Sequence, residues 1–362
     1  MAINPTRRHF TLNLGLGLGL VASVGIGLSP HRARAVETIT VLNWQGYGTD
    51  EAWALKQFTE QTGIQVKHDY FNSEEEMLTK LRTNRGVYDV VLINSARTTQ
   101  AVGEGLLAPI DLGRLPNAAA LSPALRDSSN FKLDGATYGV AWLWGINSLA
   151  VRDGTAGNPD TLAALANPAF ANRVALFDDA VTAVGVGALL SEQDINNPAD
   201  MKAVAQKLRA MKPDVRLLWS SEGQWNKSFA AGEFDVSIYW SGAAARSRNI
   251  HKLPVTFIIP PEGAIGWLDG LSLPKDSTKQ ALALAFINYM IDPQLYYKWA
   301  TEFGAPASAN QAAMQSLPAD SLNRTIHKAE YLQKLKFMGP LPDTRRQAFL
   351  DLWEETKAYY AK

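Results

Sequence analysis

A regular alternation of apolar strands and amphipathic helices, beginning just after residue 36, most constrains the fold of this chain. Residues 38–42 and 88–93 are short apolar runs typical of buried strands, and residues 64–68 alternate as a half-buried strand does. Helical patterns separate the three runs. A β-α-β-α-β order of this kind predicts a parallel sheet with right-handed crossovers.

Local end signals mark the two helices of this unit. Thr49 or Asp50 can cap the first helix, which we expect to stop at Gly63. Ser73 followed by Glu76 has capping-box spacing and predicts the start of the second helix.

The alternation resumes in the second half of the chain, so a second α/β unit is expected. A length of 362 residues also exceeds one small core and suits two domains. We expect lobe 1 at residues 36–145 plus about 266–310, and lobe 2 at residues 146–265 plus about 311–362. The expected elements are a hairpin at 132–140, strands at 174–177, 215–219, 235–240 and 270–274, and helices at 201–211, 223–231, 278–291 and 293–302.

The first 35 residues predict export. Thr6-Arg7-Arg8-His9-Phe10 precedes a Leu/Gly-rich stretch at 12–28 and then Ala33-Arg34-Ala35, which together read as a twin-arginine signal with a cleavage site. The stretch is short and rich in glycine, which favours a cleaved signal over its alternative, an anchor helix. We expect a soluble periplasmic protein that uses the twin-arginine translocase and starts at Val36.

Composition removes several classes of function. The chain has no cysteine, which excludes disulfides, Cys-ligated zinc and thiol catalysis. None of its five histidines has metal-ligand spacing, and no hydrolase or nucleotide-binding motif is present, so we expect no metal, no cofactor and no enzymatic activity. Without the signal the chain is mildly acidic and has no basic run, which disfavours nucleic acid as a partner.

Aromatic and acidic residues gather next to the predicted strands. Ligands of open α/β sheets bind beyond the carboxyl ends of the strands, so these positions are candidates for a site. An aromatic face attracts an ammonium group by about 0.5 to 2 kcal/mol, and a carboxylate adds charge-assisted hydrogen bonds. The set therefore predicts a site for a cation. It comprises Asn43, Trp44 and Tyr47; Asn94, Ser95 and Arg97; Asp178 and Asp179; Trp240 and Ser241; and Trp267 and Asp269.

The same residues carry a family resemblance across essentially all of the chain after the signal. The chain resembles the periplasmic spermidine/putrescine-binding proteins of ABC importers. The matching motifs are Trp44-x-x-Tyr47, Phe58-Thr59-Glu60-Gln61-Thr62-Gly63-Ile64, Tyr88-Asp89-Val90-Val91, Gly105-Leu106-Leu107, Trp142-x-Trp144-Gly145, Asp178-Asp179-Ala180, Tyr239-Trp240-Ser241-Gly242 and Trp267-Leu268-Asp269-Gly270-Leu271.

The resemblance implies a two-lobed type II periplasmic binding fold with a mostly parallel sheet in each lobe and the ligand between the lobes. It also implies delivery of the ligand to an ABC permease in the inner membrane. In that family the residues matching Trp44, Tyr47, Trp240 and Trp267 pack on the polyamine chain, while those matching Asp179 and Asp269 bind its ammonium groups. We expect a monomer.

Three departures bear on the ligand. Thr182 replaces a frequent acid, Ser95-Ala96-Arg97 replaces a Ser/Thr-Tyr pair, and Ala305 replaces a frequent tyrosine. One hypothesis is a shorter diamine, or an amine that also carries a carboxylate for Arg97. The alternative is that Arg97 turns to solvent or to an acid and the ligand is an ordinary polyamine.

Other functions stay open on the sequence. Thiamine, 4-aminobutyrate and sugars also suit clefts rich in tryptophan and aspartate. Tyr296-Tyr297 resembles the paired tyrosines of ferric-iron binders, although its helical context favours packing. A secreted glycoside hydrolase would use Asp178, Asp179 or Asp269 as its pair of carboxyl groups.

Overall fold

The computed structural model describes residues 37–157 and 159–362. The predicted signal sequence lies outside these residues. The described residues form one compact unit by their contacts. None of the described helices is both long and apolar enough to cross a membrane.

Most strands belong to one sheet, in the order β2-β1-β3-β12-β7-β10-β8-β9. Neighbours at the two ends of this order are parallel, with β1 beside β2 and β3, and β8 beside β9 and β10. The strands of the path are β1 Thr38–Asn43, β2 Gln65–Tyr70, β3 Val90–Asn94, β7 Val140–Arg152, β8 Val174–Phe177, β9 Val215–Trp219, β10 Val236–Trp240 and β12 Ala264–Pro274.

Two long antiparallel strands join the parallel ends. β12 pairs with β3 on one side and with β7 on the other, and β7 pairs in turn with β10. Shorter strands are attached to this centre, namely β4 Leu107–Ala108, β11 Val255–Ile258, β13 Ala307–Ser308 and β14 Leu335–Phe337. A separate hairpin contains β5 Lys132–Leu133 and β6 Ala136–Thr137.

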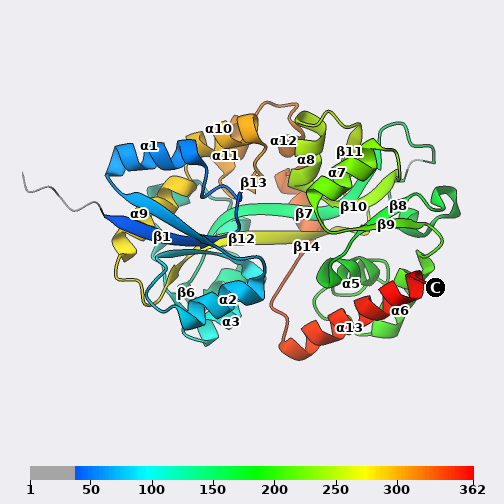
Figure 1. Cartoon of the computed structure of the whole chain (residues 1–362), viewed down its shortest axis with the longest axis horizontal. Coiled ribbons are helices and arrows are strands. Elements are labelled where there is room, and N and C mark those ends of the chain that lie inside the picture. The colour runs from blue at the N-terminus through cyan, green and yellow to red at the C-terminus, as the bar shows by residue number, and fades with distance from the viewer. Residues whose placement is uncertain (1–36, 158) are drawn as a thin grey trace, which may run out of the picture. The chain divides into compact units, whose positions relative to one another are not determined.

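Helices lie on both sides of the sheet, with α1 and α8 on one side and α2 and α5 on the other (Figure 1). Both ends of the sheet therefore have the layered α/β arrangement that the alternation predicts. The helices are α1 Ala52–Thr62, α2 Glu74–Thr83, α3 Ser95–Gly103, α4 Pro123–Arg126, α5 Ala180–Leu189, α6 Met201–Ala210, α7 Glu222–Ala230, α8 Ser241–Asn249, α9 Gln280–Met290, α10 Pro293–Phe303, α11 Gln311–Ser316, α12 Leu322–Ile326 and α13 Asp343–Tyr360.

Several local signals act as the sequence predicts. Gly63 ends α1 in the left-handed conformation at φ 74°, and the backbone N–H of Glu76 donates to Ser73 Oγ at 3.1 Å. The turn between β5 and β6 places Asp134 and Gly135 at positive φ, the conformation that favours this residue pair in hairpins. The predicted cap of α1 is wrong, because Glu51 occupies that position without a side-chain hydrogen bond.

Several elements are absent from the expectations, and β7 and α5 are two of them. β7 and α5 are apolar nearly throughout, so neither shows the one-sided pattern that reveals a half-exposed element. β12 begins six residues before the predicted strand at 270–274. Trp267 and Asp269 therefore lie within a strand and not ahead of one.

Two groups of buried side chains stabilise the fold. The larger one spans β1, β3 and α9 and includes Phe58 and Phe286, whose ring centroids are 5.2 Å apart. The smaller one is built where α5 packs on α6 and α13, and it includes Trp353. Because α5 is enclosed by these neighbours, its apolar side chains are packed against others on every side.

Candidate ligand-binding site

The centre of the candidate site is the carboxyl group of Asp269, which is 7 % exposed. Its two oxygens accept hydrogen bonds from the hydroxyl of Tyr47 at 2.9 Å and from Asn94 Nδ2 at 2.8 Å. Burial raises the pKa of Asp269 to about 6, and these two bonds oppose the rise. The segments after β1 and β3 thus hold one carboxyl group of β12 in a fixed position.

Trp267 lies two residues before Asp269, on the same face of β12, and its ring covers Gly145 of β7. A Cβ atom at Gly145 would come within 2.2 Å of that ring. Gly145 is also the partner of Trp267 across the two strands. Glycine is therefore required here so that the indole can approach the backbone of β7 closely.

A second group of predicted residues lies around the start of α5. Asp179 is the N-cap of this helix, and its carboxylate accepts the backbone N–H of Thr182 at 2.7 Å. Burial raises the pKa of Asp179, and the contacts to Thr182 oppose the rise. Asn147 Nδ2 donates to the hydroxyl of Thr182 at 3.1 Å. Thr182 thus links Asn147 of β7 to Asp179 by hydrogen bonds.

Pairing across β7 relates the two groups. Asn147 is opposite Trp240 of β10 on one side and Ile265 of β12 on the other. Directly opposed residues share a face, as do residues two apart along a strand, so Trp240 and Trp267 lie on the same face of the sheet. Trp240 packs edge-on against Phe177, with ring centroids 4.9 Å apart.

Trp44 stands apart from these direct contacts. It follows β1, is half-buried, and packs edge-on against Phe71 with ring centroids 4.5 Å apart. Trp44 and Tyr47 both follow the carboxyl end of β1. Unlike Tyr47, Trp44 forms no hydrogen bond with Asp269.

Arg97 on α3 forms an ion pair with Glu75 of α2, and its side chain is 13 % exposed. Ser95, two residues earlier, is 1 % exposed, and its hydroxyl has no hydrogen-bond partner among the described residues. The guanidinium of Arg97 is therefore already paired with an acid, whereas the hydroxyl of Ser95 can still form a hydrogen bond.

The first residue of α2, Glu74, was not among the predicted site residues. Its Oε2 is buried and has no hydrogen-bond partner among the described residues. Burial raises the pKa of Glu74 to about 8, and the negative charge of Asp269 is the second cause of this rise. A second residue that the sequence analysis missed is Asn147, whose Oδ1 is likewise buried without a partner among the described residues. The position of Glu74 just after the second strand is a signal that could have revealed it.

Comparison with known proteins places the chain in a family. Residues 53–325 match the model of the bacterial extracellular solute-binding proteins. This chain belongs to that family. The spermidine/putrescine-binding periplasmic protein 1 of Haemophilus influenzae is 32 % identical over 295 residues, which cover 80 % of this chain and 79 % of the relative. The spermidine/putrescine-binding periplasmic protein of Escherichia coli is 28 % identical, with 83 % and 86 % covered.

Solved structures confirm the fold class. The spermidine/putrescine ABC transporter substrate-binding protein of Streptococcus pneumoniae superposes with a TM-score of 0.80 at 22 % identity, over 90 % of this chain and 99 % of the other. Solute-binding proteins of this kind have two lobes, and their family is one of transport proteins and not of enzymes.

Not every acid of this solute-binding protein faces the candidate site. Asp178 accepts Trp353 Nε1 at 2.7 Å and pairs with Lys357 at 3.1 Å. Both partners come from α13, so Asp178 fixes the last helix to β8 and differs in role from its neighbour Asp179.

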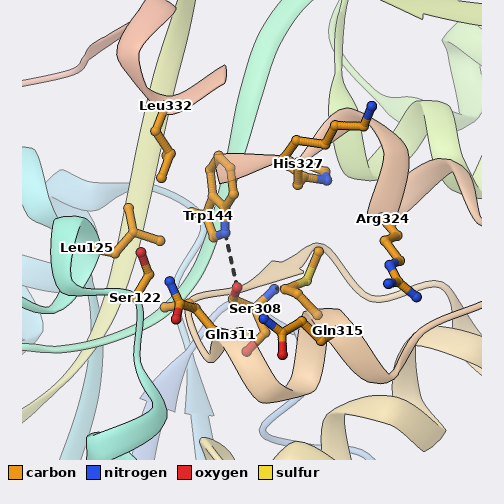
Figure 2. A pocket seen from close by; sticks show the side chains of 12 residues that line it. Ser122, Leu125, Trp144, Ser308, Gln311, Gln315, Arg324, His327 and Leu332 are labelled. Carbon is orange, nitrogen blue, oxygen red and sulfur yellow. Dashed lines mark hydrogen bonds between the residues drawn. The ribbon is translucent and has the colours of Figure 1, made fainter. Parts of the chain in front are cut away.

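Figure 2 shows a cavity of about 240 Å³ elsewhere in the solute-binding protein. Trp144 lies in its wall, with Nε1 donating to the carbonyl of Ser308 at 3.0 Å. The lining contains Arg324 and Lys328 and no carboxylate. Because an ammonium group is repelled by basic side chains, this cavity does not suit a polyamine.

The paired tyrosines of the ferric-iron alternative point to different surroundings. Tyr296 is buried, and its hydroxyl donates to the carbonyl of Pro306 at 2.7 Å, whereas Tyr297 is 43 % exposed. No group of three or more His, Cys, Asp or Glu side chains in residues 37–157 and 159–362 is placed to hold a metal ion.

Proposed function

We propose that this solute-binding protein captures a polyamine such as putrescine or spermidine in the periplasm and delivers it to an ABC permease in the inner membrane. The observation that carries the proposal is the carboxyl group of Asp269. It is buried, held by Tyr47 and Asn94, and flanked by Trp267, and it forms no ion pair with a basic side chain among the described residues. Burying a carboxylate without a counter-ion costs free energy, and a bound ligand cation would offset that cost.

Relatives support a polyamine as the ligand. The Haemophilus influenzae and Escherichia coli proteins are spermidine/putrescine-binding, and a further relative from Pseudomonas aeruginosa, 26 % identical over 89 % of this chain, is putrescine-binding. All three are periplasmic binding proteins, which supports the same location for this chain after export through the twin-arginine translocase.

The arginines near the site favour an amine without a carboxylate. Arg97 pairs with Glu75, and Arg246 pairs with Glu222 through Nε at 2.9 Å. Each guanidinium thus already has an acid, and neither is free to bind the carboxylate of a ligand such as 4-aminobutyrate. This arrangement supports an ordinary diamine or triamine.

Capture would occur between two lobes, which we propose to be residues 36–145 with about 266–310, and residues 146–265 with about 311–362. Trp44, Tyr47, Ser95, Trp267 and Asp269 would then contact the ligand from one lobe, and Asp179, Thr182 and Trp240 from the other. Contacts from both sides stabilise the closed form, because a ligand shifts a conformational equilibrium only by its differential affinity. We propose that the binding unit is a monomer.

A thermal-shift panel tests the function. We expect putrescine and spermidine to raise the melting temperature, since a ligand at a hundredfold excess over its dissociation constant stabilises the folded form by about 2.7 kcal/mol. Thiamine, 4-aminobutyrate and maltodextrin should leave it unchanged. A shift with one of these and none with the amines would refute a polyamine ligand, and turnover of a chromogenic glycoside would instead support the hydrolase.

A further inference from the structure

Glu74 is the polar group of this region that the proposed function leaves without a role. It is the first residue of α2, where a carboxylate is ordinarily stabilised by the positive end of the helix dipole. Its pKa is nevertheless raised to about 8, so burial and the charge of Asp269 outweigh that favourable term. Nothing in the folding of α2 requires such a group, because Ser73 already caps the helix.

Three polar groups of this region have unfilled bonding capacity. Glu74 Oε2 and Ser95 Oγ are buried without partners among the described residues, and Asp269 has hydrogen bonds but no counter-ion. Ser95 directly follows Asn94, which binds Asp269, and the charges of Glu74 and Asp269 interact. Buried polar atoms in native proteins nearly always have hydrogen-bond partners, so these acceptors suit a ligand that donates several hydrogen bonds.

We infer that Glu74 and Asp269 form a single subsite that binds one ammonium group between two carboxyl groups, with the hydroxyl of Ser95 as a further acceptor. An ammonium group has three N–H donors and one positive charge. The donors match acceptors on Glu74, Asp269 and Ser95, and the charge matches two carboxyl groups that have no basic partner among the described residues. This inference rests on the proposed function and adds a residue to it.

The subsite also predicts an exchange of charges. Two buried carboxyl groups close together do not both ionise, so without ligand Glu74 carries a proton at neutral pH. When R–NH₃⁺ enters, the Glu74 carboxylic acid becomes a carboxylate that accepts from the ammonium, and its proton leaves to solvent. The ligand keeps its own protons, because amines of this type titrate near pH 10.

Other charged groups around Glu74 set the size of this effect. Asp269 on β12 and Glu75 on α2 favour the neutral form of Glu74, whereas Arg97 on α3 favours the charged form. The pKa of Tyr47 is raised well above its usual value, so its hydroxyl keeps its proton throughout the relevant range. Since Arg97 is held by Glu75, it does not take the place of the ligand cation.

Calorimetry on the mature protein tests the subsite. Putrescine binding is measured at pH 7 in phosphate and in Tris, whose ionisation enthalpies differ, and the dissociation constant is measured from pH 6 to pH 9. For the natural protein we expect release of about one proton per ligand at pH 7, and affinity that rises about tenfold per pH unit up to about pH 8. Glu74→Gln should release almost none and bind at least about tenfold more weakly at pH 8.

Glu76→Gln is the matched control, since it changes the same charge in the same turn. The carboxylate of Glu76 accepts the backbone N–H of Asn72 at 2.8 Å and lies 3.6 Å from Lys80. This variant should keep the proton release and nearly the full affinity. Amine binding with the same proton release in Glu74→Gln would overturn the subsite and leave the proposed function intact. If the natural protein binds neither putrescine nor spermidine, the proposed function fails, and the subsite fails with it.

Discussion

At the scale of single residues, the candidate site is marked by where a charged side chain is buried and which side chains contact it. Asp269 lies within a strand between two others, and its neighbours supply hydrogen bonds but no positive charge. Asp178 is also an aspartate, but its carboxylate pairs with Lys357. Residue type alone therefore does not distinguish a binding carboxylate from one that fixes the scaffold.

Replacing Asp269 with asparagine should remove most of the affinity for putrescine. The side chain keeps its shape but not its charge, so the partner ammonium is buried unpaired, at a cost on the order of 2 to 5 kcal/mol. Isothermal titration at pH 8 measures this loss. Asp178→Asn is the control and should bind within about threefold of the natural protein, and a loss below about tenfold in Asp269→Asn would remove this residue from the site.

Gly145→Ala should displace the ring of Trp267, because the added methyl group would overlap it. We expect weaker putrescine binding by about tenfold or more, together with a changed tryptophan emission, since overpacking typically costs about 1 to 3 kcal/mol. Gly223→Ala is a matched control on the exposed side of α7, where an added Cβ meets no atom within 4 Å. Unchanged affinity in Gly145→Ala would show that the position of Trp267 does not matter for binding.

At the scale of elements, α5 combines a structural and a proposed binding role in one residue. Asp179 caps the helix, and α5 itself is nearly all buried and has no acidic residue, so the cap is the one acid at this helix. Asparagine caps a helix about as well as aspartate does, whereas alanine caps poorly. The two roles can therefore be separated by substitution.

Asp179→Asn should keep the stability of the protein and lose affinity for putrescine, because the cap remains and the charge is removed. Asp179→Ala should lose affinity and also about 0.5 to 2 kcal/mol of stability. Urea unfolding and titration calorimetry measure the two effects on the same samples. Full affinity in Asp179→Asn would confine this residue to its role as a cap.

At the scale of the whole molecule, β7 and β12 make one sheet out of two parallel sets of strands. The relative positions of Asn147, Trp240, Trp267 and Asp269 depend on the register of β7 with β10 and with β12. Shifting the register by one residue would turn all of these side chains to the other face. The candidate site thus depends on the pairing of strands across the whole sheet.

Glu74 should make the ligand-free protein less stable as pH rises. Its folded pKa of about 8 exceeds the ordinary value of about 4.3, so between these values the unfolded state loses the proton first. Natural protein and Glu74→Gln should be equally stable near pH 4. As pH rises to about 8, the free energy of unfolding of Glu74→Gln should increase relative to that of the natural protein, by at most about 1.4 kcal/mol per pH unit.

Denaturant unfolding from pH 4 to pH 9 measures this difference. Asp269, whose pKa is also raised, acts in the same direction in both proteins and cancels. Glu76→Gln should show the opposite sign, because the pKa of Glu76 is lowered by the N–H of Asn72 and its stabilisation is lost as pH falls. A pH-independent difference between natural protein and Glu74→Gln would mean that Glu74 is ionised in the folded state.

The sequence by itself determined the α/β class, the parallel order of β1, β2 and β3, and the approximate positions of helices such as α6, α7 and α10. These follow from periodicity and caps, which are local properties of the chain. The proposed lobes and site residues remain predictions. Only the tertiary structure decided that Arg97 pairs with Glu75 and that Glu74 lies near Asp269, because such contacts join residues distant in sequence and their energies depend on burial. Burial on all sides also removes the periodic signal, which is why β7 and α5 appeared only in the folded protein.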